Sequence, residues 1–386
     1  MRVSPKNARA LGVTLDSSRI GVIVILSVWL VSFVPSLSIA DSQLIVEESS
    51  LKVNIRGRDY LLAALLVKPS GVTTRLPIAL IAHGSPRDRA ERPNYRVGAL
   101  LPRARDLAHR GWLAVAFLRR GFGNSQGPFA EGFTCSSPDF LQALATAAED
   151  IEATRAAVAK RPDVDATRVL GLGMSVGGAA MLAWAATRPE GLVGVVNLSG
   201  GTGALMPERN CDEDGLVSAF ASYGTRSRVP TLWLYAENDS YFAPVLVRRM
   251  HAAFTHGGGD AKLDLFGPVG EDGHQLWRLF DGLMLWLPAL DRFLRAHGLP
   301  TWDPRPIAAV ASRLTPAGHR VIDSYLSAPT EKALSISSGR GLIRFWSGIG
   351  DLQTARLKSR ELCEQSSGER CDVLLENFTP VGSPRP

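Results

Sequence analysis

The sequence predicts an α/β fold in which helices cover both faces of a mostly parallel sheet. Short apolar runs recur along the chain and alternate with longer stretches of helical periodicity, a pattern typical of buried parallel strands joined by helices. The composition is that of an ordinary globular protein, with 45% hydrophobic and 21% charged residues. The 386 residues are enough for one large domain and a smaller one.

The first strands are expected to be antiparallel, because residues 44–67 contain strand-like pieces separated by Ser-Ser and by a turn at 57–59. The apolar runs that should form the other strands are 77–82, 113–118, 169–172, 192–198, 231–235 and 261–266. The clearest helical patterns between them are 139–160, 176–188 and 275–297. We therefore expect one large α/β domain over residues 41–300.

The pattern changes after residue 300. Residues 301–325 should be a linker or packing arm, since residues 301–320 contain three prolines and no strong period. Residues 326–386 predict a small α+β module, with a hairpin around 338–341, a helix at 350–364 and a strand near 371–376.

Residues 1–40 have the layout of a secretory signal peptide. A basic start leads into an apolar run from Ile20 to Val34 and then to the small-residue end Ser38-Ile39-Ala40, which predicts cleavage after Ala40. The alternative is an uncleaved membrane anchor, but a run of 15 residues is short for the roughly 20 that span a bilayer. We expect a soluble, exported protein, periplasmic or extracellular.

The net charge of +6 does not predict nucleic-acid binding. Residues 1–40 hold four basic residues against one acidic residue, and the rest of the chain has 39 basic against 36 acidic residues. So small an excess is too weak to indicate a polyanionic partner.

Four cysteines outside the leader suggest two disulfides in an exported protein. Pairing Cys363 with Cys371 closes a short loop and leaves Cys135 with Cys211. A metal site is the alternative, but neither a CxxC spacing nor an interleaved histidine pair is present.

The most specific motif lies in residues 167–190, where an apolar strand runs through Gly173-Met174-Ser175-Val176-Gly177 into an Ala-rich helix. A serine is a poor nucleophile unless it is exposed, held in place and paired with a base. A tight strand-to-helix turn presents such a serine above the sheet. The N-terminus of the helix, which is the positive end of the helix dipole, then points at a developing oxyanion. The motif therefore predicts Ser175 as a nucleophile.

The same stretch imitates a dinucleotide-binding turn through Gly171, Gly173 and Gly177. That fingerprint requires its third glycine one residue earlier, where Val176 stands. A dinucleotide site would also leave two later residues of the chain, Asp239 and His274, without a role, so we expect no nucleotide cofactor.

A nucleophile at this turn requires an acid and then a histidine later in the chain. Asp239 follows the strand at 231–235, and His274 follows the strand at 261–266 behind two glycines. His274 would accept the serine proton and Asp239 would orient and stabilise the imidazolium. Glu237 and Asp272 are alternative acids. The remaining candidates for the base, expected to be solvated, are His109, His251, His256, His297 and His319.

The strand at 77–82 ends in His83-Gly84-Ser85-Pro86, where this kind of site takes one backbone N–H for the oxyanion. We expect Ser85 and Val176 to provide the two amides, and His83 to shape the loop. Arg119 and Arg120 follow the next strand; they are either structural or contacts for an anionic group.

Taken together, these motifs resemble the α/β-hydrolase superfamily, and within it the dienelactone-hydrolase-like and acyl-peptidase-like branch. The resemblance spans about residues 50–298, through the His83-Gly84 loop, RRGFGNSQG, GMSVGG, AEND and DGHQLW in family order. It implies a sheet of about eight strands, no cofactor, and acyl-enzyme chemistry. The name-giving enzymes use a cysteine nucleophile where this chain has Ser175, so their substrate does not carry over.

The function expected is therefore a serine hydrolase that cleaves a small ester, lactone or related acyl substrate. One alternative is a peptidase or amidase of the same fold, although residues 41–76 are too few for the gating domain such peptidases usually carry. The other is a non-catalytic binding protein that retains the hydrolase fold.

Overall fold

A computed structural model describes residues 43–207, 209–348 and 350–381. The predicted signal peptide lies outside the described residues. Within those ranges, no helix is both long enough and apolar enough to cross a membrane.

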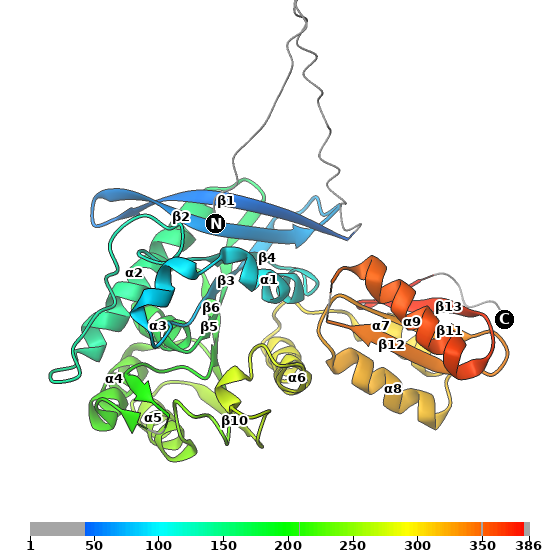
Figure 1. Cartoon of the computed structure of the whole chain (residues 1–386). Coiled ribbons are helices and arrows are strands. Elements are labelled where there is room, and N and C mark those ends of the chain that lie inside the picture. The colour runs from blue at the N-terminus through cyan, green and yellow to red at the C-terminus, as the bar shows by residue number, and fades with distance from the viewer. Residues whose placement is uncertain (1–42, 208, 349, 382–386) are drawn as a thin grey trace, which may run out of the picture. The chain divides into compact units, whose positions relative to one another are not determined.

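An eight-stranded sheet forms the centre of the larger part of the fold (Figure 1), with strand order β1-β2-β4-β3-β5-β6-β9-β10. Strand β2 is antiparallel to both neighbours, and every pairing from β4 to β10 is parallel. The strands are β1 (Leu44–Ile55), β2 (Arg58–Pro69), β3 (Leu76–Ala82), β4 (Leu113–Phe117), β5 (Val164–Met174), β6 (Leu192–Leu198), β9 (Thr231–Ala236) and β10 (Ala261–Phe266). The predicted fold class, including its antiparallel start, is confirmed.

Helices cover both faces of this sheet, and each face has its own apolar cluster. One cluster takes its helical residues mainly from α2 (Phe140–Val158), α3 (Val176–Ala185), α4 (Glu213–Arg226) and α5 (Pro244–His256). The other takes them from α1 (Leu101–Ala108) and α6 (Phe280–Ala296). The last helix begins five residues later than the pattern predicts, because 273–275 forms the short 3₁₀ helix η3 (Gly273–Gln275).

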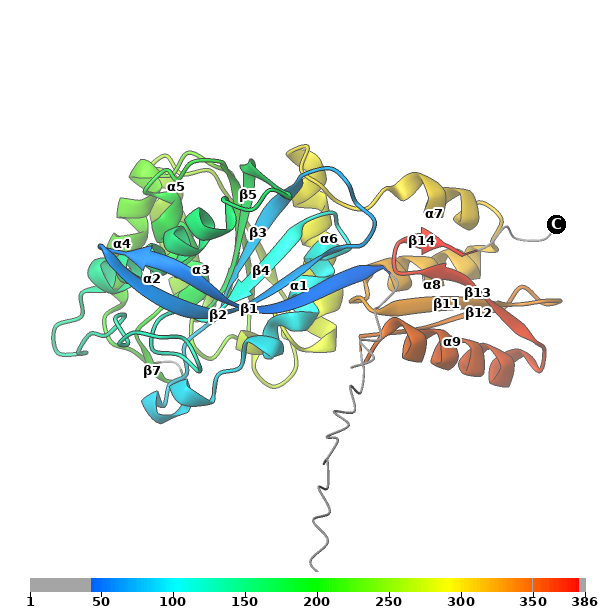
Figure 2. The ribbon, with the colours of Figure 1, turned by 90° about the horizontal axis from the view of Figure 1, so that it is seen from above.

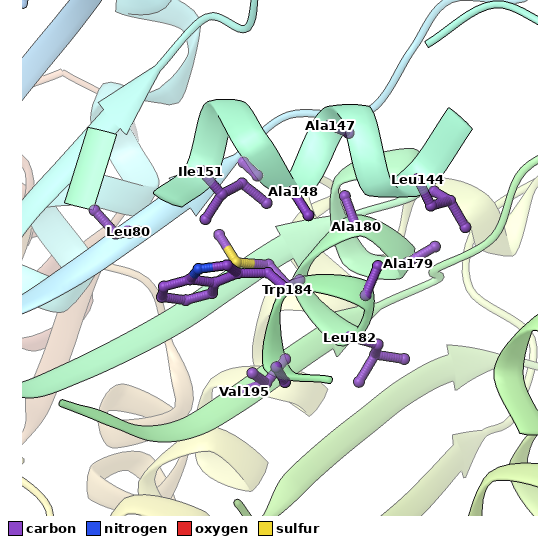
Figure 3. Close-up of a cluster of buried hydrophobic side chains, with 14 of the residues drawn as sticks. Leu80, Leu144, Ala147, Ala148, Ile151, Ala179, Ala180, Leu182, Trp184 and Val195 are labelled. Atoms are coloured by element: carbon purple, nitrogen blue, oxygen red, sulfur yellow. The ribbon is translucent and has the colours of Figure 1, made fainter. Parts of the chain in front are cut away.

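Helix α3 is enclosed by the fold, as its lack of a polar face requires. Figure 3 shows side chains of α2 and α3 packed together with Leu80 and Val195, which come from two sheet strands. Trp184 of α3 is fully buried, and its indole N–H donates to Glu152 at 2.9 Å. This packing anchors the helix that begins directly after Ser175.

A second, four-stranded sheet occupies the C-terminal part, in the order β12-β11-β13-β14. Its strands are β11 (Lys332–Ser337), β12 (Ile343–Ser347), β13 (Cys371–Glu376) and β14 (Thr379–Pro380), all antiparallel. Helices α8 (Pro316–Ser327) and α9 (Leu352–Ser367) lie on opposite faces of this sheet (Figures 1 and 2). The hairpin, helix and last strand thus occur where the sequence predicts them.

The stretch 301–325, expected as a linker or packing arm, contains α7 (Pro304–Ala311) and most of α8. Ile307 of α7 and Ile322 of α8 share an apolar cluster with Leu334 and Leu375 of the second sheet. The arm therefore packs as helices against the C-terminal sheet.

Buried polar contacts connect the C-terminal residues to α1 and the chain that follows it. The Thr330 hydroxyl donates to Asp106 at 2.7 Å, and His109 Nε2 lies 2.9 Å from Glu331 Oε1. The expectation that His109 is solvated is wrong, since only 7% of its side chain is exposed. Its partner Glu331 lies 222 residues away in sequence, so local patterning gives no sign of this burial.

Both predicted disulfides are present, Cys135–Cys211 and Cys363–Cys371. The second joins the C-terminal half of α9 to the first residue of β13 in the small C-terminal sheet. The first ties the chain before α2 to the segment before α4.

Candidate active site

Ser175 stands at the turn between β5 and α3 in a backbone conformation that side chains rarely adopt, with φ 55° and ψ −124°. Such strain persists only where the surroundings hold it. Here the Ser175 N–H donates to the Leu198 carbonyl at 2.9 Å, and the Ser175 carbonyl accepts from Gly201 at 3.2 Å. The turn is thus fixed by the neighbouring strand β6 and the loop after it.

Glycines flank this turn because backbone segments meet there. A Cβ at Gly177 would overlap the carbonyl oxygens of Ala82 and His83 at the end of β3. A Cβ at Gly173 would overlap the backbone of Gly177. The small residues therefore allow the start of α3 to pack directly against the loop that carries Ser85.

Asp239 and His274 converge on Ser175 from the ends of β9 and β10. His274 Nε2 lies 3.1 Å from Ser175 Oγ, and His274 Nδ1 lies 3.0 Å from both carboxylate oxygens of Asp239. The three residues are 5%, 4% and 3% exposed, in the order Ser175, Asp239, His274. Asp239 and His274 come 64 and 99 positions after Ser175 in the sequence. They reach it because parallel strands end at the same edge of the sheet.

The orientation of His274 is fixed from several sides. Asp239 Oδ1 accepts backbone N–H groups of Tyr241 at 2.8 Å and Phe242 at 3.1 Å, which holds the carboxylate in place. The Tyr241 ring stacks on the imidazole, with centroids 3.9 Å apart and planes 17° apart. Because a carboxylate only accepts, the hydrogen-bond network assigns the proton of neutral His274 to Nδ1 and leaves Nε2 as an acceptor for the Ser175 hydroxyl.

The two alternative acids occupy other positions. Asp272 accepts hydrogen bonds from the backbone N–H groups of Ser240 and His274, both at 3.0 Å. Burial raises the pKa of Asp272, but these hydrogen bonds outweigh it and the pKa is lowered. Asp272 thus caps the turn that carries His274, whereas the side chain of Glu237 is exposed.

The loop after β3 brings Ser85 to the same cavity as Ser175, and Val176 is the first residue of α3. His83 shapes this loop: its Nε2 accepts the Arg119 N–H at 3.1 Å, and its Nδ1 donates to the Gly84 carbonyl at 2.6 Å. Burial and the charge of Arg119 hold the pKa of His83 well below its usual range, so the ring is neutral.

Arg119 and Arg120 are both buried and paired. Arg119 forms an ion pair with Glu131 and donates to the His83 carbonyl at 2.6 Å. Arg120 binds Asp150, with Nε 2.6 Å from Oδ1. The structure supports the structural interpretation of these two arginines, because both side chains are buried and ion-paired inside the fold.

Ser175 lines two cavities. The smaller, about 190 Å³, is lined by Val176, by the Cys135–Cys211 disulfide and by residues 201–205. The larger, about 720 Å³, is lined by His274 and by Trp277, Met174 and Tyr95 among others. Both cavities therefore reach Ser175, and they share Ser85 and Tyr241 in their lining.

Several residues that line these cavities belong to none of the motifs that predict the site. Arg87, Arg89 and Arg92 line the smaller cavity, and Tyr241 lines both. The arginine-rich run RDRAERPNYR at 87–96 directly follows the Ser85 loop and was the signal available for them. Among the described residues, no group of three or more His, Cys, Asp or Glu side chains is placed to hold a metal ion.

No protein-family model and no curated protein matches the chain. The chain is similar to solved structures that include a proposed dienelactone hydrolase from Klebsiella pneumoniae (19% identity, 66% of this chain and 98% of that one, TM-score 0.46). They also include an esterase from Pyrococcus furiosus, with 14% identity over 65% of this chain and 90% of that chain and a TM-score of 0.46. A third is a proposed dipeptidyl aminopeptidase IV from Bacteroides ovatus, with 15% identity over 67% of this chain and 36% of that chain and a TM-score of 0.50. The third structure, at 15% identity and a TM-score of 0.50, shows a shared fold, and the eight-stranded, mostly parallel sheet of this chain is that of the α/β-hydrolase fold.

Proposed function

On this α/β-hydrolase fold, we propose a serine hydrolase that cleaves a small ester, lactone or related acyl substrate through an acyl-enzyme. The observation that carries the proposal is the unbroken hydrogen-bonded series from Ser175 to His274 to Asp239. The strained turn at Ser175 supports it, because such strain concentrates at sites where a side chain must be held for function.

In the proposed reaction, Ser175 Oγ attacks the substrate carbonyl carbon while His274 Nε2 takes the hydroxyl proton. Asp239 stays ionised and stabilises the imidazolium. Backbone N–H groups of Ser85 and Val176 donate to the oxyanion, at the positive end of α3. The carbon–oxygen bond to the leaving group then breaks as His274 returns the proton to the departing oxygen, and water hydrolyses the acyl-enzyme by the same steps in reverse roles.

In the proposed reaction the two cavities hold different parts of the substrate. The leaving group must receive its proton from His274, so it departs on the side of the larger cavity, which His274 lines. The acyl group then occupies the smaller cavity beside Val176. A volume of about 190 Å³ suits a short acyl chain and favours a small ester over a bulky aminoacyl substrate.

Turnover of 4-nitrophenyl acetate and butyrate, measured beside aminoacyl 4-nitroanilides, tests this order of preference. Wild type should cleave the esters faster, and Ser175→Ala should abolish both activities. Ser218→Ala, an exposed serine on α4, is the matched control and should behave as wild type. Faster amide cleavage would replace the esterase assignment with a peptidase. Absence of any turnover by folded protein would support the binding-protein alternative.

We also propose that the mature protein is exported, with residues 1–40 removed. Two disulfides support an oxidising compartment. The proposed organisation is a catalytic domain over 41–300, an arm over 301–325 and a module over 326–386, supported by the separate apolar cluster around the second sheet. Intact-mass analysis of protein recovered outside the cytoplasm should show a chain that begins at Asp41; a retained leader would contradict export by cleavage.

A further inference from the structure

The C-terminal module, residues 326–386, reaches the larger cavity beside the nucleophile. Gly348, which follows β12, is among the residues that line this cavity. Its backbone N–H donates to the Glu331 carbonyl at 3.0 Å, which extends the pairing of β11 and β12 by one residue. The other residues that line the cavity all lie between His83 and Leu283. The module therefore supplies part of the wall of a cavity that otherwise belongs to the α/β-hydrolase fold.

Helix α1 contacts both this cavity and the module. Arg103 of α1 lines the larger cavity, and its Nη2 lies 3.0 Å from Oδ2 of Asp106, three residues later in the helix. The two side chains are 6% and 1% exposed. The other carboxylate oxygen, Oδ1, accepts the Thr330 hydroxyl at 2.7 Å and the Thr330 N–H at 3.1 Å. Asp106 therefore joins an arginine of the cavity to a threonine of the module through its two oxygens.

Arg103 in turn holds the chain that follows His274. Its Nη1 donates to the Trp277 carbonyl at 3.0 Å, and Trp277 lines the larger cavity three residues after His274. The turn between them is closed by the Leu276 N–H, which donates to the Gly273 carbonyl at 3.0 Å. A guanidinium group can bind two partners at once, because its N–H groups form a rigid fork. The position of Trp277 at the cavity wall thus depends on Arg103.

The orientation of Arg103 depends on Asp106. Burial lowers the pKa of Arg103, and the negative charge of Asp106 opposes that effect. A buried ion pair is stable only when further hydrogen bonds satisfy its remaining donors and acceptors. The Thr330 hydroxyl provides such a bond, and a hydrogen bond to an ionised group is among the stronger ones. A change at Thr330 therefore reaches Trp277 through two side chains that are almost fully buried.

We propose that the C-terminal module is part of the active site and shapes the leaving-group cavity through Thr330, Asp106 and Arg103. Arg103 is the positioning residue: it holds Trp277 at the cavity wall, and the module keeps Arg103 in the orientation that does so. A bulky aromatic leaving group that packs against Trp277 requires this arrangement, whereas a methanol leaving group does not. The inference rests on the proposed function, because it assigns the leaving group to the larger cavity.

The test compares two esters of one acid, phenyl butyrate and methyl butyrate, whose leaving groups differ in size. Thr330→Val keeps the volume of the side chain and removes its hydroxyl, and Thr330 is not among the described residues that line either cavity. Relative to wild type, Thr330→Val should lower the phenyl-to-methyl ratio of kcat/KM about threefold to tenfold. Arg103→Gln removes the guanidinium fork and should lower the ratio at least as far. Thr330→Ser retains the hydroxyl and should keep the wild-type ratio.

Tyr325→Phe is the matched control for a loss of stability alone. The Tyr325 hydroxyl donates to the Asn377 carbonyl at 2.7 Å, a buried hydrogen bond of the module that does not involve Asp106. This variant should lower the thermal midpoint and keep the wild-type ratio. A wild-type ratio in Thr330→Val, or an equal fall of the ratio in Tyr325→Phe, overturns the inference.

Hydrogen–deuterium exchange gives a second readout that needs no substrate. The backbone N–H groups of Leu276, Arg278 and Leu279 are hydrogen-bonded within the turn after His274. Their exchange should be about threefold to tenfold faster in Thr330→Val than in wild type and in Tyr325→Phe. If neither ester is cleaved, the proposed function fails, and exchange still decides the inference. Faster exchange in Thr330→Val alone supports it, and equal exchange in the two variants refutes it.

Discussion

Replacing Asp239 by Asn tests how the carboxylate controls the protonation of His274. Oδ1 of Asp239 accepts two backbone N–H groups, at 2.8 and 3.1 Å, and both carboxylate oxygens lie 3.0 Å from His274 Nδ1. An asparagine must direct its oxygen at the two N–H groups, because its NH₂ group cannot accept them. The NH₂ group then takes the place of Oδ2 and donates to Nδ1.

This exchange moves the imidazole proton to Nε2. That nitrogen lies 3.1 Å from Ser175 Oγ and must accept the serine proton, so the variant holds the unreactive tautomer. In a Ser-His-Asp triad such a change lowers kcat about 10,000-fold, which corresponds to roughly 5 kcal/mol of lost transition-state stabilisation. The fold should be unaffected, since the two backbone donors keep their acceptor.

The assay is kcat and KM on 4-nitrophenyl butyrate, with the thermal midpoint measured on the same samples. Asp272→Asn is the matched control, because its side-chain oxygen can still accept the backbone N–H groups that hold the His274 turn. We expect Asp272→Asn to lose less than about tenfold, the effect of one weakened hydrogen bond. A loss below tenfold in Asp239→Asn, or a larger loss in Asp272→Asn, would refute the reasoning.

Three further changes test the packing and the charges of the structure. Asp291 accepts hydrogen bonds from Nε and Nη2 of buried Arg110 at 2.7 and 2.9 Å, and Asp291→Ala removes this partner. The free energy of unfolding, measured by denaturant titration, should fall by about 3–5 kcal/mol, and a fall below about 1 kcal/mol would contradict this. Gly177→Ala forces a methyl group against backbone carbonyls and should lower both the thermal midpoint and the ester turnover; wild-type values of either would show that the turn can yield. Burial raises the pKa of Glu331, but the hydrogen bond and charge of His109 outweigh burial, and the pKa is lowered. The free energy of unfolding of wild type should therefore exceed that of Glu331→Gln fully near neutral pH, and this difference should shrink as pH falls below the usual carboxyl pKa. A difference that stays constant with pH would exclude this linkage.

The sequence predicts the central fold well because the buried strands from β3 to β9 are apolar and alternate with helical patterns. The turn at Ser175 and the chain order of Asp239 and His274 follow from local pattern, since Ser175 and Asp239 stand just past β5 and β9 and His274 lies in the loop after β10. Their convergence could be predicted because parallel strands end at one edge of the sheet.

The arm at 301–325 shows where local pattern misleads. Its three prolines and lack of a strong period predict a linker or packing arm without helices of its own, yet Pro304 and Pro316 are the first residues of α7 and α8. Proline is tolerated there, because the first N–H groups of a helix lack an intrahelical partner in any case. A proline therefore marks a helix start as readily as a break, and only the tertiary packing of Ile307 and Ile322 decides between them.

The arginines of the smaller cavity lay beyond sequence reasoning for a different reason. A run of charged residues in a loop usually indicates a solvated surface. Arg92 is distinguished from that case by Phe129, which lies 37 residues later and packs against its guanidinium group. Contacts of this kind depend on how two loops meet, which no local pattern specifies.

The central claim is that Ser175 is an activated nucleophile, and fluorophosphonate labelling of the purified 41–386 protein tests it most directly. The phosphonyl group reacts with an activated serine hydroxyl irrespective of the natural substrate. Intact-mass measurement should show one label per chain in wild type and none in Ser175→Ala. Labelling that persists in Ser175→Ala, or a folded wild type that takes up no label, would contradict the assignment.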